Sequence, residues 1–80
     1  MKYATITAAQ IRAARALLNW TRDVLAERSG VSIRTLVSIE ADEANPKPET
    51  MEAIFIALST AGIIFIKKNG GGPGVRLKKH

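Results

Sequence analysis

Side chains that could recognise a partner gather in one stretch of this 80-residue sequence, LAERSGVSIRTLVSIE, which runs from Leu25 to Glu40. Arg34 carries a planar guanidinium that can donate parallel hydrogen bonds, and Ser32 and Ser38 carry hydroxyl groups that both donate and accept. Such groups suit the recognition of an anionic or hydrogen-bonding partner. They prompt the question of which elements position them.

Catalytic and metal-binding chemistry lacks the residues that it needs. The sequence contains no cysteine, and its only histidine is the last residue, His80. A serine nucleophile therefore has no imidazole base, and zinc has none of its usual sulfur ligands. The run NGGGPG lacks the Lys-Ser/Thr pair of a phosphate-binding loop, and no helix is expected after it. We predict neither an enzyme nor a metal or cofactor site.

Charge is distributed unevenly along a chain long enough for one modest core. The net charge is +5, yet residues 1–62 hold seven basic and seven acidic side chains. The whole excess therefore comes from the C-terminal segment, from Lys67, Lys68, Arg76, Lys78 and Lys79. The longest apolar run, AGIIFI, is far shorter than the roughly 20 residues of a membrane span. A cytoplasmic protein without membrane association is expected.

Four short helices are predicted in residues 1–62. Thr7 and Gln10 form a capping box at the start of a helix of about 11 residues. Thr21 caps a second helix that closes at Gly30, the usual left-handed C-terminal position. Ser32 caps a third helix, and a fourth begins at Pro48 and stops at Gly62. Apolar spacing places these side chains inward: Ile11, Ala14, Leu18, Leu25, Leu36, Ile39, Met51, Ile54, Phe55, Leu58 and Ala61. Trp20 is also expected in the core, and Arg28 on a solvated face.

The last segment changes from helical to strand patterning. IIFI, from Ile63 to Ile66, and VRLKK flank the turn-forming NGGGPG, which together predict a β-hairpin. No polar residue alternates with the apolar ones in this strand, which consists of Ile63, Ile64, Phe65 and Ile66. Both faces of the strand therefore require burial. One face can cover the helices, and the other is a candidate dimer contact. We therefore divide the chain into residues 1–62 and a dimerisation element with a basic end, 63–80; Lys78 and Lys79 are expected to fray.

Two short helices around Gly30 have the form of a DNA-reading helix-turn-helix, which needs a tight turn and an exposed second helix. Leu25, Ala26 and Val31 are predicted to hold the angle between the helices, together with Leu36 and Ile39. The side chains that remain outward are Ser32, Ile33, Arg34, Val37 and Ser38. Arg34 could donate two hydrogen bonds to a guanine, and Ile33 and Val37 could contact thymine methyl groups.

The combined pattern W-T-R-D-x-L-A-E-R-S-G-V-S-x-x-T-x-x-x-I-E, continued by a proline and a threonine, resembles the Cro/XRE family of helix-turn-helix regulators. The resemblance covers about residues 6–62 and implies a mainly α, lambda-repressor-like bundle of four to five helices, here with a C-terminal β-hairpin. The ending GGGPGVRLKK is similar to that of stand-alone bacterial regulators often linked to prophages and other mobile elements.

The resemblance also implies roles for matching positions. Arg22 falls where the family commonly has a glutamine that contacts phosphate or holds a base-reading side chain, and an arginine there could still contact phosphate. Ser32 matches a hydroxyl that touches the DNA backbone. Ile33, Arg34 and Ser38 match positions that face base edges. Arg15 and Glu40 match a partly buried ion pair between the first and third helices.

One departure from the family pattern lies directly after Glu40. Family members usually have a basic residue and a glycine there, whereas this chain has Ala41, Asp42 and Glu43. Two acids near the expected phosphate path should weaken DNA binding, and Asn45 and Lys47 are expected to offset them in part.

The function that we expect is that of a transcriptional regulator, a repressor that binds double-stranded DNA in the nucleoid as a homodimer. Two recognition helices would enter successive major grooves, about 34 Å apart, on a palindromic operator. The alternative is a protein-interaction module, antitoxin-like or antirepressor-like, that keeps the fold but binds DNA weakly or not at all. The acids after Glu40 and the outward Ile33 and Val37 motivate this alternative, in which the partner is a regulatory protein.

Overall fold

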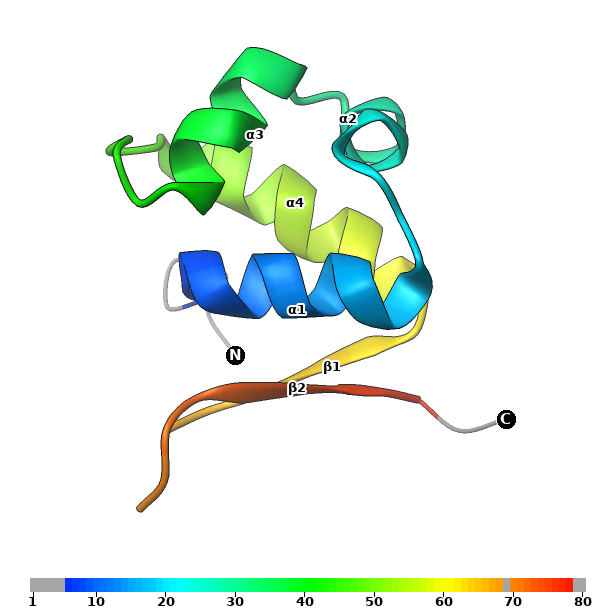
Figure 1. The fold of residues 1–80 in the computed structure, drawn as a ribbon, viewed down its shortest axis with the longest axis vertical. Coiled ribbons are helices and arrows are strands. Elements are labelled where there is room, and N and C mark those ends of the chain that lie inside the picture. Colours follow the sequence, from blue (N-terminus) through cyan, green and yellow to red (C-terminus); the bar gives the residue numbers. More distant parts are fainter. Residues whose placement is uncertain (1–5, 69, 79–80) are drawn as a thin grey trace.

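The computed structural model describes residues 6–68 and 70–78, so Lys79 and His80 lie outside the described residues. Within these residues four helices precede one antiparallel hairpin (Figure 1). The elements are α1 Ala8–Leu18, α2 Arg22–Ser29, α3 Ile33–Glu40, α4 Pro48–Thr60, β1 Ile63–Ile66 and β2 Gly74–Leu77. The predicted architecture is confirmed, with four helices. None of the described helices is long and apolar enough to cross a bilayer.

The helix ends follow the predicted capping chemistry. Thr7, Thr21 and Ser32 each accept a hydrogen bond on the side-chain oxygen from the backbone N–H three residues later, at 3.1 to 3.2 Å. Gln10 completes the capping box, because its Oε1 accepts from the Thr7 backbone N–H at 2.8 Å. Gly30 ends α2 with φ 76°, a left-handed conformation that costs glycine little. Local sequence thus fixes where these helices begin and end.

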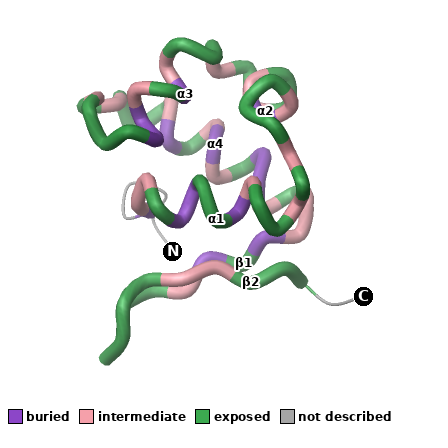
Figure 2. Tube along the Cα trace, in the orientation of Figure 1, coloured by how far each residue is buried: buried purple, intermediate pink, exposed green. Residues whose placement is uncertain are grey.

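The core lies where the helices and β1 converge, as the buried segments in Figure 2 show. Fully buried side chains come from α1, α2, α3 and α4: Ile11, Ala14, Leu25, Leu36, Ile54 and Leu58. Trp20, Ala26 and Val31 are partly buried against this core. The inward positions predicted from spacing are therefore largely confirmed, although Leu18, Phe55 and Ala61 are only half-buried.

The hairpin packs beneath α1 and α4 and has an inner and an outer face. Ile63 and Phe65 point inward and are buried, and the Phe65 ring lies 5.3 Å from the Phe55 ring of α4. Ile64 stands opposite Arg76 in the register and alternates to the outer face, where 38% of its surface is exposed. The apolar strand β1 thus buries the side chains of one face, Ile63 and Phe65, in the core.

A buried side chain of α1 joins the hairpin to the helices. Gln10 is only 3% exposed, and its Nε2 donates to the carbonyl oxygens of Ile66 at 3.2 Å and Gly74 at 2.8 Å. These two residues are partners in the β-ladder. One amide group therefore satisfies a carbonyl from each strand and fixes the hairpin against α1.

Candidate nucleic-acid interface

The turn between α2 and α3 is fixed by a side chain at the end of α2. Ser29 Oγ donates to the Leu25 carbonyl oxygen at 2.7 Å and accepts from the Val31 backbone N–H at 3.2 Å. The Gly30 N–H donates to the Ala26 carbonyl oxygen at 2.9 Å. With Leu25 and Leu36 buried below, the turn and both helices form one braced unit. We refer to residues 22–40 as the helix-turn-helix unit.

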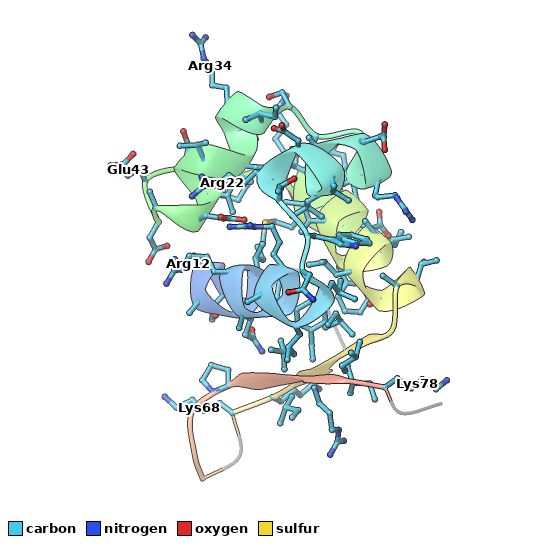
Figure 3. All side chains as sticks on the ribbon, turned by 45° about the vertical axis from the view of Figure 1, so that its right-hand side comes forward. Arg12, Arg22, Arg34, Glu43, Lys68 and Lys78 are labelled. Atoms are coloured by element: carbon cyan, nitrogen blue, oxygen red, sulfur yellow. The ribbon has the colours of Figure 1, made fainter. Side chains whose placement is uncertain are left out.

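The outer face of α3 combines one cation with two aliphatic side chains. Arg34 points away from the bundle at the end of the molecule opposite the hairpin (Figure 3). Ile33 and Val37 lie one helical turn apart and are 46% and 43% exposed. Ser38, predicted to be outward, is half-buried, while the others predicted there are exposed. The outer face of α3 thus offers a partner both polar and apolar side chains.

Ser32 uses its hydroxyl within the helix-turn-helix unit. Its Oγ accepts from the Thr35 backbone N–H and donates to Thr35 Oγ1 at 2.9 Å. The capping role is therefore present in the free protein, and the predicted contact with a DNA backbone would be additional to it.

Glu40, at the end of α3, is the electrostatic centre of the site. Its side chain is 1% exposed, and its Oε2 accepts from Arg15 Nε at 2.7 Å while its Oε1 accepts from Arg15 Nη2 at 2.8 Å. Arg22 Nε also donates to Oε1, at 3.0 Å, although Arg22 belongs to α2 and is 44% exposed. One carboxylate thus joins α1, α2 and α3.

The titration of Glu40 follows from these contacts. Burial by itself raises the pKa of the carboxyl, but the hydrogen bonds and charges of Arg15 and Arg22 outweigh burial and hold the pKa below its ordinary value. The hydrogen bond to Glu40 raises the pKa of Arg15, against the opposing effect of its own burial. The charged pair is therefore the stable form near neutral pH.

Three of the arginine contacts are not predicted by the sequence. Arg22 was assigned to phosphate, yet its Nε is engaged by Glu40 in the free protein. Arg12 Nη1 donates to the Glu40 backbone oxygen and so satisfies a carbonyl at the end of α3. Arg28, predicted as a solvated residue, is exposed but its guanidinium lies 5.2 Å from the Trp20 ring. Each of these contacts joins different elements, so no spacing pattern in the local sequence predicts it.

The segment after α3 carries the residues that depart from the family pattern. Asp42 adopts φ 62°, the left-handed conformation that a glycine would take without strain. Asp42, Glu43, Asn45 and Lys47 are all exposed, and Glu43 extends from the end of α3 (Figure 3). The described structure brings these four residues to the side of the helix-turn-helix unit where α3 ends.

The geometry of two braced helices with an exposed second helix defines a helix-turn-helix protein. A family profile described as Helix-turn-helix matches residues 11–60, and the chain belongs to this family, the Cro/C1 type or XRE family of DNA-binding transcription regulators. The match includes α2, α3, α4 and most of α1, and it stops before the hairpin. Comparison of the sequence with curated proteins gave no significant match.

Proposed function

We propose that this protein is a repressor that binds a palindromic operator as a homodimer, with α3 in the major groove. The observation that carries the proposal is the outer face of α3, where Arg34 points away from the bundle beside the exposed Ile33 and Val37. Arg34 reads guanine O6 and N7 with two hydrogen bonds, and the aliphatic pair contacts thymine methyl groups. Occupation of such a site by a dimer excludes RNA polymerase.

Side chains around α3 position this helix on the DNA backbone. Ser32 contacts a phosphate, Ser38 lies at the rim of the base-reading face, and Asn45 and Lys47 contact the backbone beyond the end of α3. Arg22 donates its Nε to Glu40, so its terminal nitrogens are the groups that reach a phosphate. Glu40 would then align Arg22 for this contact, as a carboxylate orients a guanidinium.

A test compares two duplexes, one selected by the wild-type protein from random sequence and one with the same composition scrambled. Fluorescence anisotropy of Arg34→Ala is expected to show a loss of about 5- to 150-fold on the selected duplex, since such a contact discriminates by about 1–3 kcal/mol. Arg28→Ala removes an equal charge from α2 and is the matched control, with similar small losses on both duplexes. A selected duplex bound equally well by Arg34→Ala would refute the reading role.

The homodimer is proposed to form through the outer face of the hairpin. Ile63 and Phe65 are buried in the core of their own chain, so the apolar side chains that β1 leaves for a second copy are Ile64 and the half-buried Ile66. Ile64→Glu is expected to give a monomer in sedimentation velocity. Ile56→Glu is the matched control, because Ile56 is 53% exposed on α4. A dimer that persists in Ile64→Glu would exclude this interface.

A second function, binding of a regulatory protein instead of DNA, is favoured by one observation. Ile33 and Val37 give α3 an exposed apolar surface close to the acids Asp42 and Glu43. Under this proposal the wild-type protein selects no duplex from random sequence even at low salt, and Ile33→Ser abolishes capture of the protein partner. Salt-dependent selection of one sequence favours the repressor instead.

A further inference from the structure

The hairpin has a strand edge that is not paired in the described part of the chain. Among residues 6–68 and 70–78, the sheet contains only β1 and β2. The Lys78 N–H donates to the Gly62 carbonyl oxygen at 2.7 Å, and hydrogen-bonded and non-hydrogen-bonded pairs alternate along an antiparallel ladder. Val75 and Leu77 therefore occupy non-hydrogen-bonded positions, and their backbone N–H and C=O groups point away from β1. We refer to this side of β2 as the β2 edge.

Side chains of two kinds alternate along the β2 edge. Val75 and Leu77 share the inner face with Phe65 and Ile63, their partners in the register. Arg76 and Lys78 alternate with them and lie on the outer face. An unpaired edge can accept a further strand. Such a strand would meet aliphatic side chains on one face of the sheet and cations on the other.

Helix α1 extends the aliphatic side of this edge. It runs beside β2 in the same direction (Figure 1), and Gln10 contacts Gly74 at the start of β2. Leu17 follows Gln10 by about two helical turns, and Leu77 ends β2, so each lies about 10 Å from this contact along its own element. Leu17 is 43% exposed and Leu77 41%. Aliphatic surface is thus left uncovered on both elements beside the edge.

The outer side of the edge carries positive charge without compensation. Arg76 and Lys78 are exposed, and neither belongs to an ion pair within the described residues. No acid follows Glu52 in the sequence. A second copy of β2 would place these cations against the same cations, which is unfavourable across a strand pair. All seven acids of the chain lie in α2, α3, α4 or the loop after α3, so none is available on a strand of this protein.

We propose that the β2 edge binds an extended segment of another protein, in which acidic residues alternate with aliphatic ones. The segment pairs antiparallel to β2 through the outward backbone groups of Val75 and Leu77. Its acids face Arg76 and Lys78, and its aliphatic side chains lie against Leu77 and the end of α1. Backbone pairing supplies affinity, and the alternating side chains supply specificity.

The site is separate from the proposed DNA contact. Lys78 and the hairpin lie at the end of the molecule opposite Arg34 (Figure 3), so a bound segment faces away from a duplex that α3 enters. Ile64, on the outer face of β1, stays available for the proposed dimer contact. The inference therefore goes beyond the proposed function, and a failure of DNA binding would leave it standing.

The test is calorimetric titration of the whole chain with a capped peptide of about six residues, a usual strand length, in which Glu and Val alternate. This peptide should bind. N-methylation of its Val residues removes the N–H groups that face β2 in an antiparallel pair, and should lower affinity by at least about tenfold. N-methylation of its Glu residues changes N–H groups that face away, and should have little effect. Equal affinities of the two methylated peptides, or no binding of the parent peptide, would overturn the proposal.

A second titration separates strand addition from attraction by charge alone. Arg76→Ala/Lys78→Ala should weaken binding of the alternating peptide by about 2- to 30-fold, since each cross-strand ion pair contributes about 0.2–1 kcal/mol. Lys67→Ala/Lys68→Ala is the matched control, because these exposed cations follow β1 and lie off the β2 edge. A peptide of the same composition, with its Glu and Val residues in separate blocks, should bind more weakly to the wild-type protein. Equal losses in the two double variants, or equal binding of the block peptide, would contradict the proposed site.

Discussion

Arg15 of α1 holds both carboxylate oxygens of Glu40 in α3, with Nε 2.7 Å from Oε2 and Nη2 2.8 Å from Oε1. The two residues are 25 positions apart in the sequence, and Arg15 Nη1 also donates to the Trp20 carbonyl oxygen at 3.0 Å. The orientation of the recognition helix is therefore fixed by charge as well as by apolar packing.

Arg15→Met is expected to destabilise the protein by about 3–5 kcal/mol, because it leaves most of the partner charge of buried Glu40 unmatched. Chemical denaturation measures the change. Arg15→Met/Glu40→Met removes both charges and should recover much of the loss. A double variant that is less stable than Arg15→Met would contradict this account of the pair.

Acid should weaken the fold through Glu40. The pKa of Glu40 in the folded state lies below its ordinary value of 4.5, so the unfolded chain takes up the proton first as pH falls. The contribution of Glu40 is thus complete above the ordinary value and is lost as pH falls through the lower, folded value. Unfolding curves from pH 7 to pH 2 should show this loss, and Glu40→Gln should show a smaller dependence over the same range.

Asp42→Asn is expected to strengthen DNA binding without disturbing the fold. Asparagine tolerates the left-handed conformation at φ 62° as aspartate does, so only the charge changes. Removal of a negative charge near the proposed phosphate path should raise affinity a few-fold at low salt, less at high salt. Anisotropy with the scrambled and selected duplexes measures both effects. Glu27→Gln is the control, because Glu27 is exposed on α2. An equal gain in DNA affinity in this variant would mean that net charge alone explains the effect of Asp42→Asn.

Gln10→Ala should loosen the hairpin, because the carbonyl oxygens of Ile66 and Gly74 lose their shared donor. A buried unsatisfied polar group costs about 1–3 kcal/mol. Hydrogen exchange of β1 and β2 amides should accelerate while the amides at the centre of α4 change less. Gln10→Glu keeps a side chain of similar size but removes the N–H donor, because a carboxylate cannot donate. This variant should be at least as disruptive as Gln10→Ala.

Gly30→Ala is expected to destabilise the protein by about 1 kcal/mol, because alanine is strained at φ 76°. No atom lies within 4 Å of the added Cβ, so the cost is conformational and not steric. Gly30→Asn, which enters this conformation more readily, should cost less in thermal unfolding. Equal costs for the two variants would argue against a conformational origin.

Local chemistry explains how much of this fold is predictable from the sequence. Thr7, Thr21, Ser32 and Gly30 act within one turn of their own helix, so their roles follow from neighbours in the sequence. The Arg15–Glu40 pair was predicted only through the family resemblance, because 25 residues separate its members.

The contacts that were missed all depend on packing between distant elements. Arg22 on Glu40, Arg12 on the Glu40 carbonyl and Gln10 on the hairpin link residues that are 18, 28 and 56 or more positions apart. Polar side chains on a helix surface have many partners within reach, and periodicity does not choose among them. The left-handed conformation of Asp42 likewise had no signal, because aspartate there looks like an ordinary loop residue.

The position of α1 between α3 and the hairpin has a geometric consequence for the proposed dimer. Gln10 fixes α1 to the hairpin and Arg15 fixes it to α3, so one path from the recognition helix to the proposed dimer contact runs through this helix, and another runs through α4, whose Phe55 packs on Phe65. In a dimer joined by its hairpins, α1 would be one of the two helices, with α4, that set how many base pairs separate the two half-sites. Changes in its packing would alter the preferred operator spacing while leaving the bases read within each half-site the same.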